Sequence, residues 1–397
     1  MVTGSSRQAV ASRRAAAFMF WETVLSKRDD KDAILLLAPS LRAVSGVSTH
    51  VTLLMNSELR EQYRLIHFQV GSEGRKETRW TRALRIAMSP FAIAVAIVRF
   101  SPTIVHINTS LNQRAFWRDF AHLLVSKTLG RKVVFQIHGG SLEAYSRNGR
   151  VVRSAVSFAA KLADAVVVIT TAEQWSFKNI GPRHLEFIPN GIDLDQFPLT
   201  SGKQYDSGMF RLLFIGRLHP DKGVLEAVEA IRILRDERIS NDVCLTIVGS
   251  GPAEQTIQEA IRKHRLEDRV RLVGPVYGPE KVKLFVDADV VVFPTYHEGL
   301  PYVLLESLAS GTPVVTTKVG GIPDIVQEGV HALFVKPHDA LGLAKAISSL
   351  ISDLDRLERM SANCVRRARE QYGVKRVAQQ FASLYKAVAP RRRRELF

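Results

Sequence analysis

From Ala33 onward, short apolar runs rich in β-branched residues alternate with longer stretches whose apolar residues recur every three to four positions. The first pattern predicts buried strands and the second predicts helices, so the chain is expected to form parallel sheets with helices on both faces. Five strand candidates lie in the first half, at 33–39, 64–70, 103–108, 132–138 and 164–170. Six more follow, at 210–216, 243–249, 270–274, 289–295, 313–317 and 331–335.

A stretch with Pro, Gly and Ser but no apolar periodicity separates the two series of strands. We therefore predict two doubly wound α/β domains in succession. The predicted boundaries are 1–195 for the first domain, which begins with a basic arm at 1–30, 196–209 for the linker, 210–375 for the second domain, and 376–397 for a C-terminal helix and basic tail. Ligands of such sheets bind where the carboxyl ends of the strands meet, so the residues just after each strand are the candidates for chemistry.

Positive charge is concentrated in the first half of the chain. The 397 residues include 55 Lys and Arg against 39 Asp and Glu, and residues 1–200 carry 26 basic and 15 acidic side chains. Four of the remaining basic residues lie together in the tail, at 391–394. A basic surface attracts nucleic acid, an anionic lipid leaflet or a phosphorylated acceptor, although it also simply favours solubility.

The two cysteines and the apolar runs bear on the compartment. Cys244 lies in a predicted strand and Cys364 in a predicted helix, without metal-binding spacing, which excludes a disulfide framework and favours a reducing compartment. The longest apolar run, 91–98, ends at Arg99 and is far shorter than the ~20 residues that cross a bilayer. It predicts a packed helix. Residues 1–28 faintly resemble a transit peptide, but we treat them as part of the basic arm.

The loop at 216–223 has the composition of an anion-binding turn. Gly216 lets the chain turn close to a ligand, Arg217 supplies a planar fork of donors, and Lys222 supplies a point charge. Gly223 then leads into a helix whose amino end favours anions. The loop therefore predicts a pyrophosphate clamp, with an ordinary charged surface turn as the alternative.

A second loop and helix, 297–315, carry two acids eight positions apart, Glu298 and Glu306. Between them, Gly299, Leu300 and Pro301 form a turn that opens a helix. Helical spacing places Glu306 away from the core side. Acids near a helix start can simply be helix caps, but this alternative accounts for one carboxylate better than for the pair.

The combination of GRLxxxKG, the pair Glu298 and Glu306, the PNGID segment at 189–193 and GGIPDIV at 320–326 resembles the GT4-type family of retaining GT-B glycosyltransferases, over most of residues 33–375. This resemblance implies two Rossmann-like domains that face each other across a cleft. It implies that Arg217 and Lys222 contact the donor phosphates, that Glu306 holds the ribose hydroxyls and that Glu298 contacts the transferred sugar. It also implies that neither a cofactor nor a metal is needed.

The same resemblance points to six further residues. Gly249 and Gly251 match a turn near the nucleotide, and Gly46 matches the second glycine of a loop that approaches the donor phosphate. The first glycine of that pair is Ser45 here, a departure that leaves the shape of the loop open. His138 matches a histidine near the reacting sugar. Asn190 and Asp193 match an element that we interpret as a structural turn at the domain junction.

We therefore predict a cytoplasmic retaining hexosyltransferase that uses a UDP- or GDP-sugar and a saccharide or lipid-linked acceptor, in polysaccharide or glycolipid biosynthesis. Peripheral contact with an anionic membrane, on its cytoplasmic face, is expected from the basic first half, and nucleic acid is not expected as a partner. The alternatives are a related enzyme, such as a DNA-glucosylating transferase or a sugar-nucleotide epimerase, and a catalytically silent module that binds membranes or polyanions.

Overall fold

A computed structural model describes residues 31–72, 75, 77–198, 202–203, 205, 208–236 and 243–389. Every element described below belongs to the unit Ala33–Phe397. The predicted basic arm at 1–30 and the basic tail at 391–394 lie outside the described residues.

The first sheet has six parallel strands in the spatial order β2-β1-β3-β4-β5-β6. The strands are β1 (Ala33–Ala38), β2 (Arg64–Gln69), β3 (Ile104–Thr109), β4 (Lys132–Ile137), β5 (Ala165–Val168) and β6 (Leu185–Phe187). The helices between them are α2 (Gly46–Asn56), α3 (Leu59–Gln62), α4 (Arg79–Phe100), α5 (Gln113–Thr128), α6 (Leu142–Ser146), α7 (Arg150–Leu162) and α8 (Thr171–Lys178), and the 3-10 turn η1 (Leu194–Gln196) follows β6.

The second sheet also has six parallel strands, in the order β12-β11-β10-β7-β8-β9. They are β7 (Phe210–Ile215), β8 (Val243–Val248), β9 (Val270–Gly274), β10 (Val290–Phe293), β11 (Val314–Thr317) and β12 (Ala332–Val335). Their helices are η2 (Pro220–Lys222), α9 (Val224–Asp236), α10 (Glu254–Lys263), α11 (Gly278–Asp287), α12 (Tyr302–Ala309), α13 (Ile322–Ile325), α14 (Ala340–Ile351), α15 (Leu354–Arg367), the π-helical η3 (Ala368–Tyr372) and α16 (Val374–Val388).

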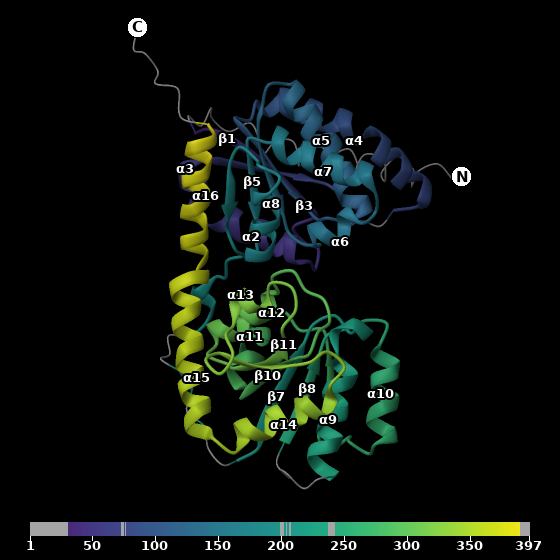
Figure 1. Cartoon of the computed structure of the whole chain (residues 1–397), viewed down its shortest axis with the longest axis vertical. Helices are drawn as coiled ribbons and strands as arrows, with labels where there is room; N and C mark the ends of the chain where they lie inside the picture. Colours follow the sequence, from purple (N-terminus) through teal and green to yellow (C-terminus); the bar gives the residue numbers. More distant parts are fainter. Residues whose placement is uncertain are drawn as a thin grey trace, which may run out of the picture. The chain divides into compact units, whose positions relative to one another are not determined.

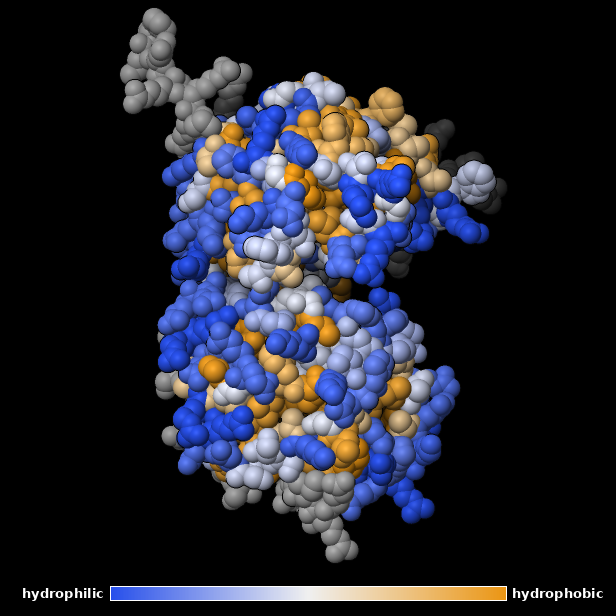
Figure 2. Space-filling view, in the orientation of Figure 1, coloured by the Kyte–Doolittle hydropathy of each residue, from blue (hydrophilic) through white to orange (hydrophobic). Residues whose placement is uncertain are grey.

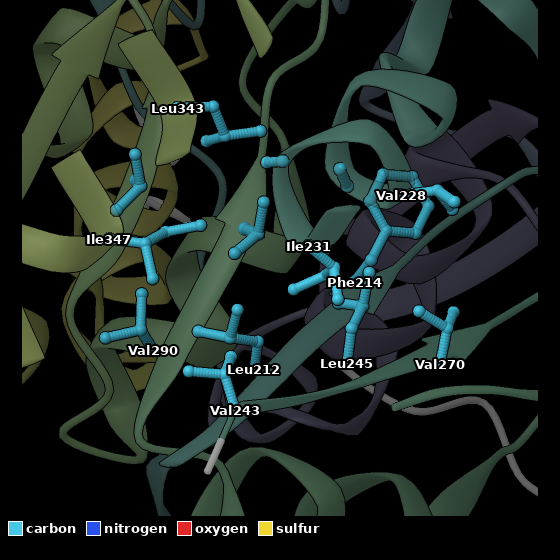
Figure 3. Close-up of a cluster of buried hydrophobic side chains, with 14 of the residues drawn as sticks. Leu212, Phe214, Val228, Ile231, Val243, Leu245, Val270, Val290, Leu343 and Ile347 are labelled. Carbon is cyan, nitrogen blue, oxygen red and sulfur yellow. The ribbon is translucent and has the colours of Figure 1, made fainter. Parts of the chain in front are cut away.

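Alternate residues of each central strand enter different cores, as the two-residue period of a strand requires. In the second sheet, Leu212 and Phe214 pack under α9 and α14, whereas Leu213 and Ile215 pack toward α12. Figure 3 shows the first of these cores, in which Val228, Ile231, Leu343 and Ile347 cover the strands. Since both faces are buried, the strands are apolar throughout, which explains why the sequence pattern detected them.

The last helix, α16, packs against the first sheet, although the chain has by then completed the second. Phe381 and Tyr385 are fully buried with Ile34 and Leu36 of β1, and α16 lies beside α3 (Figure 1). Backbone hydrogen bonds from Ile192 to Tyr372 and from Val374 to Ile192 mark the point of return.

The structure confirms the α/β class, the two sheets and all eleven predicted strands to within one or two residues at each end. The three-residue strand β6 was not predicted, because Leu185–Phe187 is too short to show a pattern.

The prediction of a packed helix at 91–98 is wrong in an important respect. The apolar run is the second half of the 22-residue helix α4, of which only Ile93, Ala96 and Ile97 are buried. By length and composition α4 is the one helix among the described residues that could cross a membrane, and only 17% of its most apolar window is buried. Many of its exposed side chains are large and apolar, among them Trp80, Phe91 and Val98.

Candidate donor-binding and active site

A pocket of about 410 Å³ contains ten of the twelve residues predicted to form the site. It is built from the loops that follow β1, β4, β7 and β10, where the carboxyl ends of parallel strands place ligands. The ten residues are Gly46, His138, Gly216, Arg217, Lys222, Glu298, Gly299, Leu300, Pro301 and Glu306.

The remaining two predicted residues, Gly249 and Gly251, do not line this pocket. Both have positive φ, and a Cβ atom on either would collide with backbone, of Gly216 at the first and of Leu218 at the second. The absence of a side chain therefore lets the β8–α10 loop pack directly behind the Arg217 loop. In this structure the two glycines support the loop around Arg217, and a contact of theirs with the nucleotide stays a prediction.

Arg217 and Lys222 bring two cations to the pocket from opposite ends of the β7–α9 loop. The Arg217 side chain is exposed, and no carboxylate among the described residues forms an ion pair with it. Lys222 donates from Nζ to Glu298 Oε1 at 2.6 Å. The turn η2 ends directly after Lys222 at Gly223, whose φ of +67° and close approach to the Pro294 carbonyl exclude a side chain. A guanidinium with no acidic partner next to a lysine is suited to bind a diphosphate.

Glu298 is held in place by three neighbours. Its carboxylate accepts hydrogen bonds from Lys222 and from Thr295 Oγ1, the latter at 3.2 Å. Its backbone carbonyl lies against Gly320, where a Cβ could not fit. Burial raises the pKa of Glu298 above its ordinary value, an effect that Lys222 and Thr295 partly offset. The GGIPDIV segment at 320–326 therefore supports the loop that carries Glu298.

Glu306 faces the pocket from α12, while Leu304, Leu305 and Leu308 of the same helix are buried in the core. Its Oε1 accepts a hydrogen bond from Lys281 Nζ at 2.6 Å, and its Oε2 is buried with no hydrogen-bond partner. Burial raises the pKa of Glu306, and Lys281 opposes this shift. An unpartnered buried acceptor of this kind is suited to receive ligand hydroxyls.

Lys281 is a site residue that sequence reasoning missed. It lies in α11, also lines the pocket, and has a 28% exposed side chain. Nothing in the local sequence around Lys281 distinguishes it from the other lysine of α11, Lys283, since its partner is 25 residues away. Only the tertiary structure could have identified it.

His138 lies at the end of β4 with a fixed ring. Its Nε2 is 2.8 Å from Asn108 Oδ1, and Asn108 donates in turn from Nδ2 to the Leu37 carbonyl at 3.1 Å. The Asn108 amide is therefore oriented with its oxygen toward the ring, which makes Nε2 the protonated nitrogen of a neutral imidazole. Burial lowers the pKa of His138 well below its ordinary value, and the nearby His50 and His106 lower it further.

Ser45 replaces the glycine expected at this position, and it has a role of its own. It has extended backbone angles, which need no glycine, and its Oγ caps α2 by accepting from Ser48 N at 3.3 Å. The amino end of α2, from Ser45 to Val47, lines the pocket. A helix amino end carries partial positive charge, so α2 adds to the attraction that Arg217 and Lys222 exert on an anion.

Asn190 also lines the pocket, and its Nδ2 donates to the Leu300 carbonyl at 3.0 Å. It thereby joins the segment after β6 to the turn before α12. Asp193 caps η1 by accepting from Asp195 N. Both contacts agree with the interpretation of this element as a structural turn.

Solved structures place this architecture in a known class. Sucrose-phosphate synthase from Thermosynechococcus elongatus matches with a TM-score of 0.72 at 20% identity, over 90% of this chain and 99% of that one. The Anabaena protein HepE, solved in complex with UDP-glucose, matches with a TM-score of 0.67 at 20% identity, over 89% and 99%. The fold is that of a GT-B glycosyltransferase.

The chain belongs to the GT4-type glycosyltransferases. The model described as Glycosyltransferase Family 4 matches residues 35–196, and the one described as Glycosyl transferases group 1 matches residues 202–371. The resemblance predicted from the sequence motifs is thereby confirmed.

Two curated relatives show how far the similarity extends. Glycogen synthase of Mycobacterium tuberculosis is 33% identical over 207 residues, which is 52% of this chain and 49% of the relative. A D-inositol 3-phosphate glycosyltransferase of Pseudarthrobacter chlorophenolicus is 37% identical over 177 residues, 43% and 42% of the two chains. The matched regions span about half the length of these relatives.

Proposed function

We propose that this protein is a retaining hexosyltransferase that moves a sugar from a UDP- or GDP-sugar to a saccharide or lipid-linked acceptor, in polysaccharide or glycolipid biosynthesis. One observation carries the proposal: a cationic pair, a helix amino end and two largely buried carboxylates converge on one pocket. This set matches the chemistry of a nucleotide-sugar, which has a doubly charged diphosphate between two groups rich in hydroxyls.

The diphosphate would lie between Arg217 and the amino end of α2, where Lys222 could also reach it. As the bond from the anomeric carbon to the diphosphate oxygen breaks, negative charge grows on that oxygen. Cations fixed in advance stabilise this charge more in the transition state than in the ground state, which is what accelerates the step. Because two side-chain cations and a helix end supply this charge, we propose that no metal is required.

The two acids would divide the donor between them. Glu306, with its unpartnered Oε2, would accept from the ribose hydroxyls, and Glu298 would hold the transferred sugar with its orientation fixed by Lys222 and Thr295. His138 would contact the same sugar as a neutral ring. HepE has been solved in complex with UDP and with UDP-glucose, which supports a donor of this type.

Retention follows if the acceptor oxygen bonds to the anomeric carbon from the face that the diphosphate leaves. The acceptor proton then passes to the departing diphosphate oxygen, and the nucleoside diphosphate is released. Both pocket acids pair with lysines rather than standing free as nucleophiles. We therefore assign them to binding and orientation.

The features that bear on the acceptor lie in the first half of the chain. The relatives range from a glycogen synthase to a D-inositol 3-phosphate glycosyltransferase, so they do not select one acceptor. We propose that the protein acts in the cytoplasm and contacts an anionic membrane peripherally, since the first half is basic and α4 presents apolar side chains to the surface.

The test is the release of free nucleoside diphosphate from a panel of UDP- and GDP-sugars, with and without a lipid-linked acceptor. Arg217→Ala and Lys222→Ala should each lower turnover at least tenfold and weaken binding of the nucleoside diphosphate. Arg262→Ala, on the exposed side of α10, is the matched control and should change neither. Wild-type activity in both site variants would refute the clamp, and transfer onto duplex DNA would favour the DNA-glucosylating alternative.

A further inference from the structure

A second pocket, of about 900 Å³, lies between α4 and α5 in the first half of the chain. Its floor includes Pro39 after β1 and Asn108 at the end of β3, again at the carboxyl edge of the sheet. None of the predicted site residues lines it, and the proposed donor contacts make no use of it.

Four arginines line this pocket, and two of them are already paired. Arg85 bonds to Glu77 at 2.6 and 3.0 Å, and Arg118 bonds to the buried Asp119 with two contacts of 2.7 Å. Arg82 and Arg114 form no ion pair with any acidic side chain of the described residues. The pocket therefore carries two cations in excess, which matches the charge of a phosphate group.

The pocket adjoins the donor site. Val47 lines both pockets, and Asn108, which lines the arginine pocket, holds the ring of His138 in the donor pocket. A molecule whose anionic group lies on Arg82 and Arg114 can therefore extend a hydroxyl toward the transferred sugar.

The outer surface of α4 is an apolar ridge, formed by residues at intervals of four, four, three, four and three positions. This spacing places all six on one face of the helix, over a length of about 27 Å. They are Trp80, Leu84, Met88, Phe91, Val95 and Val98, with exposed fractions of 87%, 66%, 51%, 66%, 66% and 69%. Figure 2 shows apolar side chains gathered over the region of α4 and α5.

The amphipathic pattern of α4 is inverted, since the arginines that line the pocket lie on its inner side. Arg82, Arg85 and Ser89 face the pocket, and Ile93 and Ile97 continue the same face into the core. Because Ile93 and Ile97 pack into the core beside the first sheet, α4 in this fold lies along the domain rather than across a bilayer. The ridge can instead lie in the membrane surface, where Trp80 and the exposed Arg79 and Arg99 at its ends suit anionic head groups.

We infer that the arginine pocket binds the phosphate end of a lipid-anchored acceptor whose hydrocarbon chain lies beside the α4 ridge in the membrane surface. The inference rests on the proposed function, to which it adds the acceptor class and its site. Ile86 and Trp117 line the pocket and are also exposed, so an apolar rim connects the phosphate site to the ridge.

The pocket is tested by calorimetry with farnesyl phosphate, farnesol and inorganic phosphate as probes. Wild-type protein should bind farnesyl phosphate more tightly than either of the others. The double variant Arg82→Ala/Arg114→Ala should weaken this binding at least about tenfold, and Arg114→Ala alone should do so in part. Arg79→Ala removes the same charge one turn away on the same helix and should change little, since Arg79 does not line the pocket.

The ridge is tested by sedimentation with phosphatidylglycerol-containing vesicles. Leu84→Gln/Met88→Gln/Val95→Gln should reduce binding at least tenfold, and Leu341→Gln, an exposed apolar residue of α14, should not. If the triple variant only turns a dimer into a monomer, with vesicle binding unchanged, the ridge is an interface between copies and the inference is wrong.

Binding of the nucleoside diphosphate, measured on every variant, separates this inference from the proposed function. Wild-type affinity of the double variant for farnesyl phosphate, with nucleotide binding intact, would overturn the inference alone. Equal affinity of the wild-type protein for inorganic and farnesyl phosphate would refute the assignment of a lipid-anchored acceptor. If the double variant loses farnesyl phosphate binding but the wild-type protein turns over no nucleotide-sugar, the phosphate site is supported and the proposed function is refuted instead.

Discussion

Glu306→Gln is the substitution that most directly tests how the donor is held. Oε1 of Glu306 accepts from Lys281, whereas Oε2 is buried without a hydrogen-bond partner. One ribose hydroxyl donating to Oε2 forms a hydrogen bond to a charged acceptor, worth roughly 1.5–3 kcal/mol. At about 1.4 kcal/mol per tenfold, its loss should weaken nucleoside diphosphate binding by roughly ten- to 150-fold. The amide keeps the size and shape of the side chain, so the fold should be preserved.

The assay pairs the substitution with a change in the ligand. Calorimetry compares wild type and Glu306→Gln, each with UDP and with its 2′-deoxy and 3′-deoxy analogues, or with the GDP set if that base binds more tightly. If Glu306 accepts from the ribose, wild type should lose affinity for at least one analogue, and the variant should lose little more when the same hydroxyl is removed. The interaction energy then appears as the difference between the two losses.

Glu298→Gln is the internal control, because Glu298 is assigned to the departing sugar. It should cut turnover while leaving affinity for the free nucleotide nearly unchanged. If removing a ribose hydroxyl weakens binding to Glu306→Gln by the same factor as binding to wild type, Glu306 does not touch the ribose. If both variants bind the free nucleotide alike, the proposed division between the two acids is refuted, and the pair acts as a scaffold for the loop.

Two further predictions concern residues around the site. Burial raises the pKa of Glu173 from 4.5 to about 7, so the folded state holds a proton that the unfolded chain loses as pH rises from about 4.5 to 7, and stability should fall over that window. Glu173→Gln cannot ionise and should therefore be more stable above pH 7 by up to about 3 kcal/mol, as urea unfolding at pH 5 and pH 8 would reveal; equal pH dependence in both proteins would contradict this. Asn108→Ala should lower turnover with little effect on nucleotide affinity, because it removes the acceptor that orients His138, and Asn108→Asp, which keeps that oxygen, should recover part of the loss in initial-rate measurements. Equal loss in the two Asn108 variants would argue against a positioning role.

The architecture could be predicted because burial on both faces leaves a strong local signal. Each central strand, such as β7 with five of its six residues buried, is apolar along nearly its whole length. The loops of the donor pocket were predictable for a related reason, since strand ends fix their position and two short motifs carry the side chains, Arg217 and Lys222 in one and Glu298 and Glu306 in the other. The Lys281 contact left no such signal, because it joins two helices that meet only after folding.

The exposure of α4 could not be predicted from run length. The apolar run at 91–98 looked like a buried helix because apolar residues usually face inward. Here Arg82 and Arg85 line the pocket, where Arg85 pairs with Glu77, and large apolar side chains of the same helix point outward. A helical projection of residues 79–100 shows the stripe from Trp80 to Val98, but only the fold shows which side of the helix is covered.

The donor site depends on the last helix of the chain through a cluster of three histidines. His106 bonds to Tyr385 of α16 at 2.6 Å and to Gln136 at 2.9 Å, and the His50 ring lies between Phe381 of α16 and His138, with centroids 5.7 and 4.8 Å away. Burial lowers the pKa of His50 to about 4 and that of His106 to about 3. The cluster is therefore neutral at physiological pH, and it packs as an extension of the apolar core rather than repelling itself. Since His138 stands at the end of this cluster and inside the donor pocket, the docking of α16 on the first sheet sets the position of a side chain that the proposed reaction needs, even though α16 lines no part of that pocket.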